Sequence, residues 1–281
     1  MLNRLKRTIL QYPAVSRFVL AAVLFVAALM LADVVGKHVK FIYTGFFLLL
    51  IATWILYRTE NKSLKEIGLN LNLRNISFLF FGLLLGIVAF AVSTYSRTVY
   101  TGEQWHINPT IDWFILAKGL YIVLPTVATQ QLIFRGYPFM KTVEVSNLFI
   151  ANIIWGLLFA LYHNIWGNPI ILPFTILSFL ISHYVFSASL LKSSTLCLPI
   201  GIHLGHNWSS QYFNGYSATD KGIFYITNQQ NFNSWQAFLM FWFTYNLGFI
   251  ILGYLFWKRK GTLTVRRVPQ GFMDSKIKQS L

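Results

Sequence analysis

Long apolar runs separated by short polar stretches form the hydrophobic pattern of this chain. Eight of these runs are candidate membrane helices, since roughly 20 apolar residues cross the hydrocarbon core of a bilayer. The predicted segments are 15–35, 41–57, 76–94, 113–134, 148–162, 170–190, 196–213 and 235–257. The pattern therefore predicts an all-α, polytopic transmembrane helical bundle of about eight spans, which forms a single domain over residues 1–257.

Composition and charge support a membrane protein. Hydrophobic residues make up 56% of the chain and charged residues only 11%, whereas an ordinary soluble domain has roughly 25% charged residues. The net charge of +15 would also suit a nucleic-acid-binding protein. However, the basic residues lie between apolar runs, which indicates contact with anionic lipid instead of nucleic acid. Residues 258–281 are basic and contain Pro269 and Gly271, so we expect a disordered cytoplasmic tail at the membrane surface.

The distribution of basic residues predicts the orientation. With eight spans and a cytoplasmic N-terminus, 18 of the 23 Lys and Arg residues lie in cytoplasmic segments. The other five are Lys37, Lys40, Arg97, Lys118 and Lys221. This excess follows the positive-inside rule, so both termini are expected in the cytoplasm. The compact chain favours a bacterial inner membrane over that of the endoplasmic reticulum.

Polar and ionisable side chains inside apolar segments are costly, so each is a candidate functional site. They form three clusters, at Gln130, Gln131 and Arg135, at His163, and at His203, His206 and Asn207. Within the first and third clusters, residues four apart share one helix face. We therefore expect a polar cavity between the fourth, fifth and seventh segments. Gly201 and Gly205 would let another helix approach this place closely, and the lone His183 of the sixth segment is assigned a structural role.

Simpler interpretations exist for each cluster alone. Arg135 would snorkel to lipid phosphates at a helix end, and a single histidine at a helix end is usually an interfacial residue. Taken in order, however, the clusters resemble the CAAX prenyl protease and bacteriocin-processing family of intramembrane proteases, also called CPBP or Abi proteins. Its motifs are Glu-Glu-x-x-x-Arg, Phe-x-x-x-His and His-x-x-x-Asn, and residues 116–208 carry similar residues in the same order. Phe134-Arg135-Gly136 also continues the first motif as in the family.

This resemblance implies an endopeptidase that cleaves a hydrophobic or prenylated peptide, or a lipidated membrane protein, within a membrane cavity. In the family, the first glutamate and the first motif histidine are thought to activate a water molecule. These places correspond to Gln130 and His163. The second motif histidine and the asparagine are thought to stabilise the oxyanion, and these correspond to His203 and Asn207.

The chain departs from the family in its first motif, because Gln130 and Gln131 replace both glutamates, while Arg135 keeps the arginine place. A carboxylate can accept a proton from water, but an amide cannot, and loss of a general base typically lowers a rate by ~10²–10⁴. An amide still keeps the shape and the hydrogen-bonding capacity of the site. We therefore expect an impaired protease homologue, or pseudoprotease, that still binds a peptide or lipidated tail.

Several alternatives stay open. The chain could be a non-catalytic membrane regulator, or an active protease in which His163 is the base. It could also be an engineered variant, in which the Gln pair inactivates an active parent protease. A small transporter is supported only by the buried polar residues, and no inverted repeat is visible. No cofactor is expected, although His163, His203 and His206 are candidates for a zinc site. Membrane lipid is the other expected partner.

Overall fold

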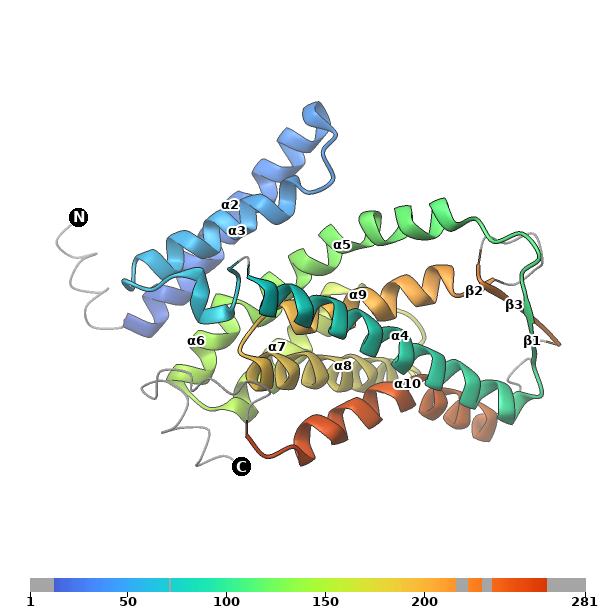
Figure 1. Ribbon diagram of the computed structural model, residues 1–281. Helices are drawn as coiled ribbons and strands as arrows, with labels where there is room; N and C mark the ends of the chain where they lie inside the picture. The colour runs from blue at the N-terminus through green and yellow to red at the C-terminus, as the bar shows by residue number, and fades with distance from the viewer. Residues whose placement is uncertain (1–12, 71, 216–221, 229–233, 262–281) are drawn as a thin grey trace.

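The helices of the protein coincide with the predicted apolar segments. The computed structural model describes residues 13–261, except 71, 216–221 and 229–233. Its α-helices are α2 (Pro13–Val39), α3 (Thr44–Arg58), α4 (Leu73–Thr101), α5 (Trp113–Arg135), α6 (Tyr137–Val145), α7 (Leu148–Tyr162), α8 (Leu172–Ser193), α9 (Cys197–Tyr212) and α10 (Trp235–Lys258). The all-α helical bundle is thus confirmed (Figure 1). Most of the predicted tail lies outside the described residues.

Local capping explains where several helices begin. The side chains of Asn72, Asp112, Asn147 and Ser234 each accept a hydrogen bond from a backbone N–H in the first turn of α4, α5, α7 and α10, respectively. Such caps satisfy N–H groups that have no partner within the helix. The short α6 was not predicted as a separate helix. It begins directly after α5, with Pro138 in its first turn, where proline is well tolerated.

Five helical stretches within the described residues are long and apolar enough to cross a membrane. They are Ala14–Val39, Leu73–Thr101, Trp113–Val145, Leu172–Ser193 and Trp235–Lys258. The helices α3 and α7 are apolar but shorter, at 15 residues each. Many large hydrophobic side chains, such as Phe80 and Phe149, are exposed on the outer surface, as expected of a surface that faces lipid. The protein is thus an integral membrane protein of the helical type, and the number of eight spans stays a prediction.

The helices α4 and α9 pack closely against each other. Glycines line both sides of this interface, at Gly82 and Gly86 on α4 and at Gly201 and Gly205 on α9. A Cβ atom on Gly205 would lie 2.1 Å from the carbonyl oxygen of Leu83, which is far inside van der Waals contact. Only a hydrogen atom fits between the two backbones. The predicted close approach at Gly201 and Gly205 is therefore confirmed, and α4 is the helix that makes it.

A small sheet departs from the predicted all-α structure. It contains β1 (Gln104–Ile107), β3 (Phe224–Thr227) and β2 (Asn214–Gly215) in that order, with β1 antiparallel to β3. Figure 1 shows it beyond the ends of α4, α5 and α9. Strands of two to four residues leave too short a pattern to be recognised in a sequence. The sheet joins the α4–α5 connection to the α9–α10 connection, so it holds one end of the bundle together.

A network of charges around Glu60 connects α2, α3 and α6. The carboxylate of Glu60 accepts a hydrogen bond of 2.6 Å from the Tyr137 hydroxyl. It also forms ion pairs with Lys141 at 2.9 Å, Lys62 at 3.2 Å and Arg17 at 3.6 Å. Several pairs that share one half-buried carboxylate stabilise a fold more than an isolated surface pair does. This network therefore anchors α2 and α6 to the turn that follows α3.

The Glu60 network predicts a loss of stability in acid. Burial alone would raise the pKa of Glu60, but hydrogen bonds from Tyr137 and Lys141 outweigh it and lower the pKa from its ordinary 4.5 to about 2. A lowered pKa means that the stabilisation is complete above pH 4.5 and is lost as the pH falls toward 2. We expect Glu60→Gln to lower the Tm in detergent at neutral pH and to remove part of this acid dependence.

The matched control for this prediction is Asp33→Asn. Asp33 pairs with Lys37 at 2.6 Å, but both side chains are exposed, and exposed pairs contribute little to stability. The control should therefore leave the pH dependence of Tm unchanged. A Glu60→Gln protein with the same acid dependence as the unaltered protein would show that the network does not stabilise the fold.

Candidate functional site

The side chain of His203 lies at the centre of a buried polar cluster between α5 and α9. The amide of Gln131 on α5 lies 3.0 Å from Nδ1 of His203, and the amide of Asn207 lies 3.2 Å from Nε2. A neutral imidazole donates from one ring nitrogen and accepts at the other. The amide nitrogen of each residue faces one ring nitrogen, so the ring is contacted at both nitrogens and accepts a hydrogen bond at one of them.

Aromatic rings of α7 and α8 complete the surroundings of His203. The ring of Phe186 stacks on the imidazole with centroids 4.7 Å apart, and Phe159 presents its edge at 6.1 Å. Both rings are almost completely buried. Sequence reasoning missed Phe186, because an aromatic residue in an apolar helix carries no signal that separates it from ordinary packing. The site therefore uses four helices, of which α8 was not expected.

Arg135 is the most unusual residue of the site. Its side chain is fully buried, and its guanidinium carbon lies 4.0 Å from the ring centroid of Phe159 and 4.9 Å from that of Phe186. Such contacts are cation–π interactions. Nε, Nη1 and Nη2 of Arg135 have no hydrogen-bond partner in the described part of the chain. Arg135 does not snorkel to a surface, so the simpler interpretation of this residue is wrong.

His163 lies beside the cluster at the end of α7. Its Nδ1 is 2.7 Å from the carbonyl oxygen of Phe159, and its ring stacks on Phe179 with centroids 4.4 Å apart. A ring that donates from Nδ1 keeps Nε2 as an acceptor. Gln130 is buried, and its side-chain oxygen has no partner among the described residues. The Gln130 and His163 side chains share no hydrogen bond in that part of the chain, so their joint role in activating water stays a prediction.

His206 lies three residues from His203 on α9, but it packs against Phe249 and lines a cavity of ≈ 240 Å³ that His203 does not line. Across the described ranges, no three His, Cys, Asp or Glu side chains form a group that could hold a metal ion. The candidate set of His163, His203 and His206 is therefore not brought together.

Two carboxylates that could act as bases in place of the motif glutamates also lie outside the cluster. Asp33 pairs with Lys37 on an exposed face of α2. Glu144 on α6 pairs with Lys141 at 3.2 Å, next to the Glu60 network. Neither residue is within the group that surrounds His203.

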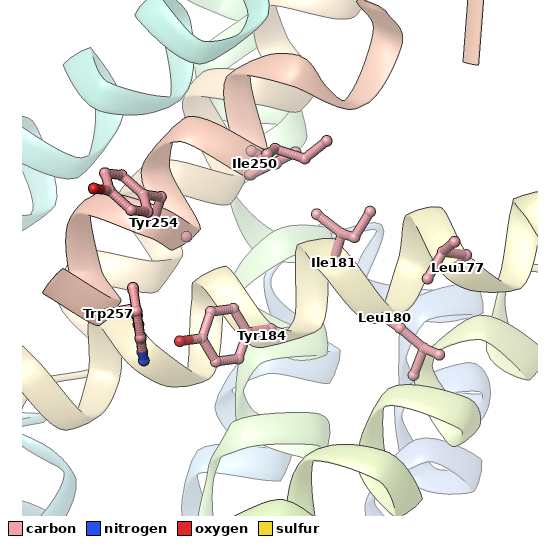
Figure 2. Close-up of a pocket in the computed structure, with 9 residues that line it drawn as sticks. Leu177, Leu180, Ile181, Tyr184, Ile250, Tyr254 and Trp257 are labelled. Carbon is pink, nitrogen blue, oxygen red and sulfur yellow. The ribbon is translucent and has the colours of Figure 1, made fainter. Parts of the chain in front are cut away.

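A larger groove of ≈ 450 Å³ lies between α8 and α10. It is lined by Leu177, Leu180, Ile181, Tyr184, Phe249, Ile250, Gly253, Tyr254 and Trp257. Figure 2 shows these mostly apolar side chains along the two helices. No motif residue lines the groove. The predicted polar cavity between α5, α7 and α9 is neither of these two cavities, and it stays a prediction.

A comparison with known families agrees with the motifs. Residues 112–209 match the family model of Rce1-like type II CAAX prenyl endopeptidases. The match runs from the residue that caps α5 to the last turns of α9, and it includes all three motifs. The resemblance to this family is therefore confirmed over these residues. Neither curated proteins nor solved structures gave a match to the chain.

Proposed function

Because residues 112–209 match the Rce1-like type II CAAX prenyl endopeptidases, we propose that the protein is a catalytically impaired relative of these intramembrane proteases. It binds the C-terminal part of a hydrophobic or prenylated peptide and does not cleave it efficiently. The observation that carries the proposal is the contact between Gln131 and His203, in which the amide lies 3.0 Å from Nδ1. An amide here orients the imidazole but adds no basicity.

Among the residues that the structure describes, Asp33 and Glu144 do not replace the missing glutamates. Gln130 and Gln131 are both buried, and the two carboxylates that could have substituted for them pair with lysines elsewhere. His163 is therefore the group that can accept a proton, through Nε2. A histidine without a carboxylate partner lacks the second group that the family uses to activate water. Slow residual hydrolysis is the most that we expect from it.

The binding half of the site is retained. Amides contact both ring nitrogens of His203 and fix the position of the ring. Polar side chains fixed in this way, here His203 and Asn207, are the kind of groups that stabilise an oxyanion. Apolar rings surround these groups, as in most ligand sites, where a few polar groups are set among apolar side chains. This arrangement supports binding of an apolar peptide and gives no specific support to a transporter.

The proposal is tested with the purified protein in detergent. A quenched prenylated peptide that also carries a photo-crosslinker reports binding and cleavage in one sample. We expect crosslinking to the intact peptide and no release of fluorescence above that of a heat-denatured control. Repeated turnover by the unaltered protein would refute the impairment. A lack of both crosslinking and cleavage in a folded sample would refute the proposed function.

A further inference from the structure

The guanidinium of Arg135 is a buried charge that forms no ion pair with any residue that the structure describes. Its side chain is fully buried, and its three nitrogens have no hydrogen-bond partner among the described residues. A charge removed from water is strongly destabilising unless it is paired and hydrogen-bonded. Contacts with the faces of Phe159 and Phe186 offset only part of this penalty. The site is therefore incomplete without a group that is negatively charged.

Other buried polar atoms of α5 and α8 also have no partner among the described residues. Seven of the eleven buried side-chain nitrogen and oxygen atoms without a partner in the described ranges belong to Gln130, Gln131, Arg135 and His183. Within the described residues, the unmet hydrogen-bonding capacity is thus concentrated on one end of α5 and on His183 of α8. His183 is fully buried, and its ring lies 6.3 Å from Phe159, the ring that also covers Arg135. Buried polar groups are normally satisfied, so this cluster has the character of a binding site.

We propose that this cluster is a receptor for one carboxylate, namely the free C-terminus of the bound peptide. The inference rests on the proposed function, since a peptide of that class supplies the terminus. A guanidinium binds a carboxylate through two parallel hydrogen bonds. A single negative charge neutralises Arg135, whereas a doubly charged phosphate would leave excess charge in an apolar site.

The Gln pair explains why the receptor accepts an outside carboxylate. Gln131 and Arg135 lie one turn apart on α5. A glutamate in place of Gln131 would therefore pair with the arginine. With glutamine there, the described part of the chain provides no carboxylate of its own to Arg135. The change at Gln130 removes the general base, and the change at Gln131 opens an anion site beside it.

The receptor would also place the peptide relative to His203. Phe186 contacts both residues, with its ring 4.9 Å from the Arg135 guanidinium carbon and 4.7 Å from the His203 ring centroid. A terminus held at Arg135 would thus bring the preceding residues toward His203. Arg135 would set the position of the peptide, while His203 contacts its backbone.

The test compares two hydrophobic peptides that differ only in the C-terminus, one a free carboxylate and one an amide. We expect the unaltered protein to bind the carboxylate peptide about 10- to 100-fold more tightly, the range for hydrogen bonds to a charged group. Arg135→Met should abolish this preference while the affinity for the amide peptide is kept. The matched control is Arg74→Met, because Arg74 also lies against an aromatic ring, that of Phe78 at 5.5 Å. It should leave the preference intact.

A second variant keeps the test decisive if Arg135→Met does not fold. Gln131→Glu provides an internal carboxylate one turn from Arg135, so it should reduce the preference for the carboxylate peptide. Equal affinity of the unaltered protein for both peptides would overturn the carboxylate receptor and leave the proposed function standing. Failure to bind either peptide would overturn the proposed function itself.

Discussion

Changing both Gln130 and Gln131 to Glu is expected to raise cleavage of a hydrophobic or prenylated peptide by ~10²–10⁴-fold, the usual contribution of a general base. The reason is that the other motif residues are already present. His203 is held at both ring nitrogens, and His163 is oriented by the Phe159 carbonyl. A carboxylate in this buried place would accept the proton that an amide cannot take. The measurement is fluorescence release from the quenched peptide.

The control for this gain is a third change in the same background. Adding His203→Ala should lower the rate again by ~10²–10³-fold, the usual effect of removing an oxyanion-stabilising group. His106→Ala should leave it unchanged, because His106 lies on β1, where it contacts Thr227. A folded, membrane-inserted double variant that cleaves the peptide no faster than the unaltered protein would contradict the prediction. It would show that the site lacks more than its general base.

Gly205→Ala is expected to destabilise the protein by about 3 kcal/mol, at the upper end of the usual effect of overpacking. The added Cβ would lie 2.1 Å from the carbonyl oxygen of Leu83. Both groups belong to helix backbones, so a side-chain rotation cannot relieve the overlap. The helices α4 and α9 would have to move apart, which also displaces His203 on α9. Thermal unfolding in detergent measures the loss.

Gly36→Ala is the matched control, since it adds the same methyl group to another helix. No atom lies within 4 Å of a Cβ at Gly36. Alanine has a higher helix propensity than glycine by about 1 kcal/mol, so this variant should be neutral or slightly more stable. Equal Tm values for the two variants would contradict the glycine contact as a determinant of stability.

The sequence alone predicted the helices well and their ends less well. The third predicted segment was 76–94, but α4 runs from Leu73 to Thr101. Its last turns are polar and lie beyond the apolar run. Their helical state is supported by the ion pair of Arg97 with Glu103 at 3.0 Å and by Gly102, which ends the helix in the left-handed conformation. Such local interactions outweigh the low hydrophobicity of the segment.

The three motifs were recognisable in the sequence because each consists of residues four apart on one helix. The pairing of His203 with Asn207 follows from that spacing alone, and the structure contains it. The contact of His203 with Gln131 does not follow from spacing, since it joins two helices. His206 is three residues from His203, yet it packs against Phe249 and lines a cavity that His203 does not line.

The sequence by itself determined where the chain is helical, which residues are polar within apolar segments, and that both motif glutamates are absent. Apolar segments in a membrane must satisfy their own backbone hydrogen bonds, so their helical state is a local property. The tertiary structure alone decided that Phe159 and Phe186 enclose Arg135, that Gln131 meets His203, and that Asp33 and Glu144 lie elsewhere. These contacts depend on how closely helices approach and how they are rotated. The close approach of α4 and α9 requires the glycines of both helices to face each other. The sequence of one helix alone does not determine which helix it faces.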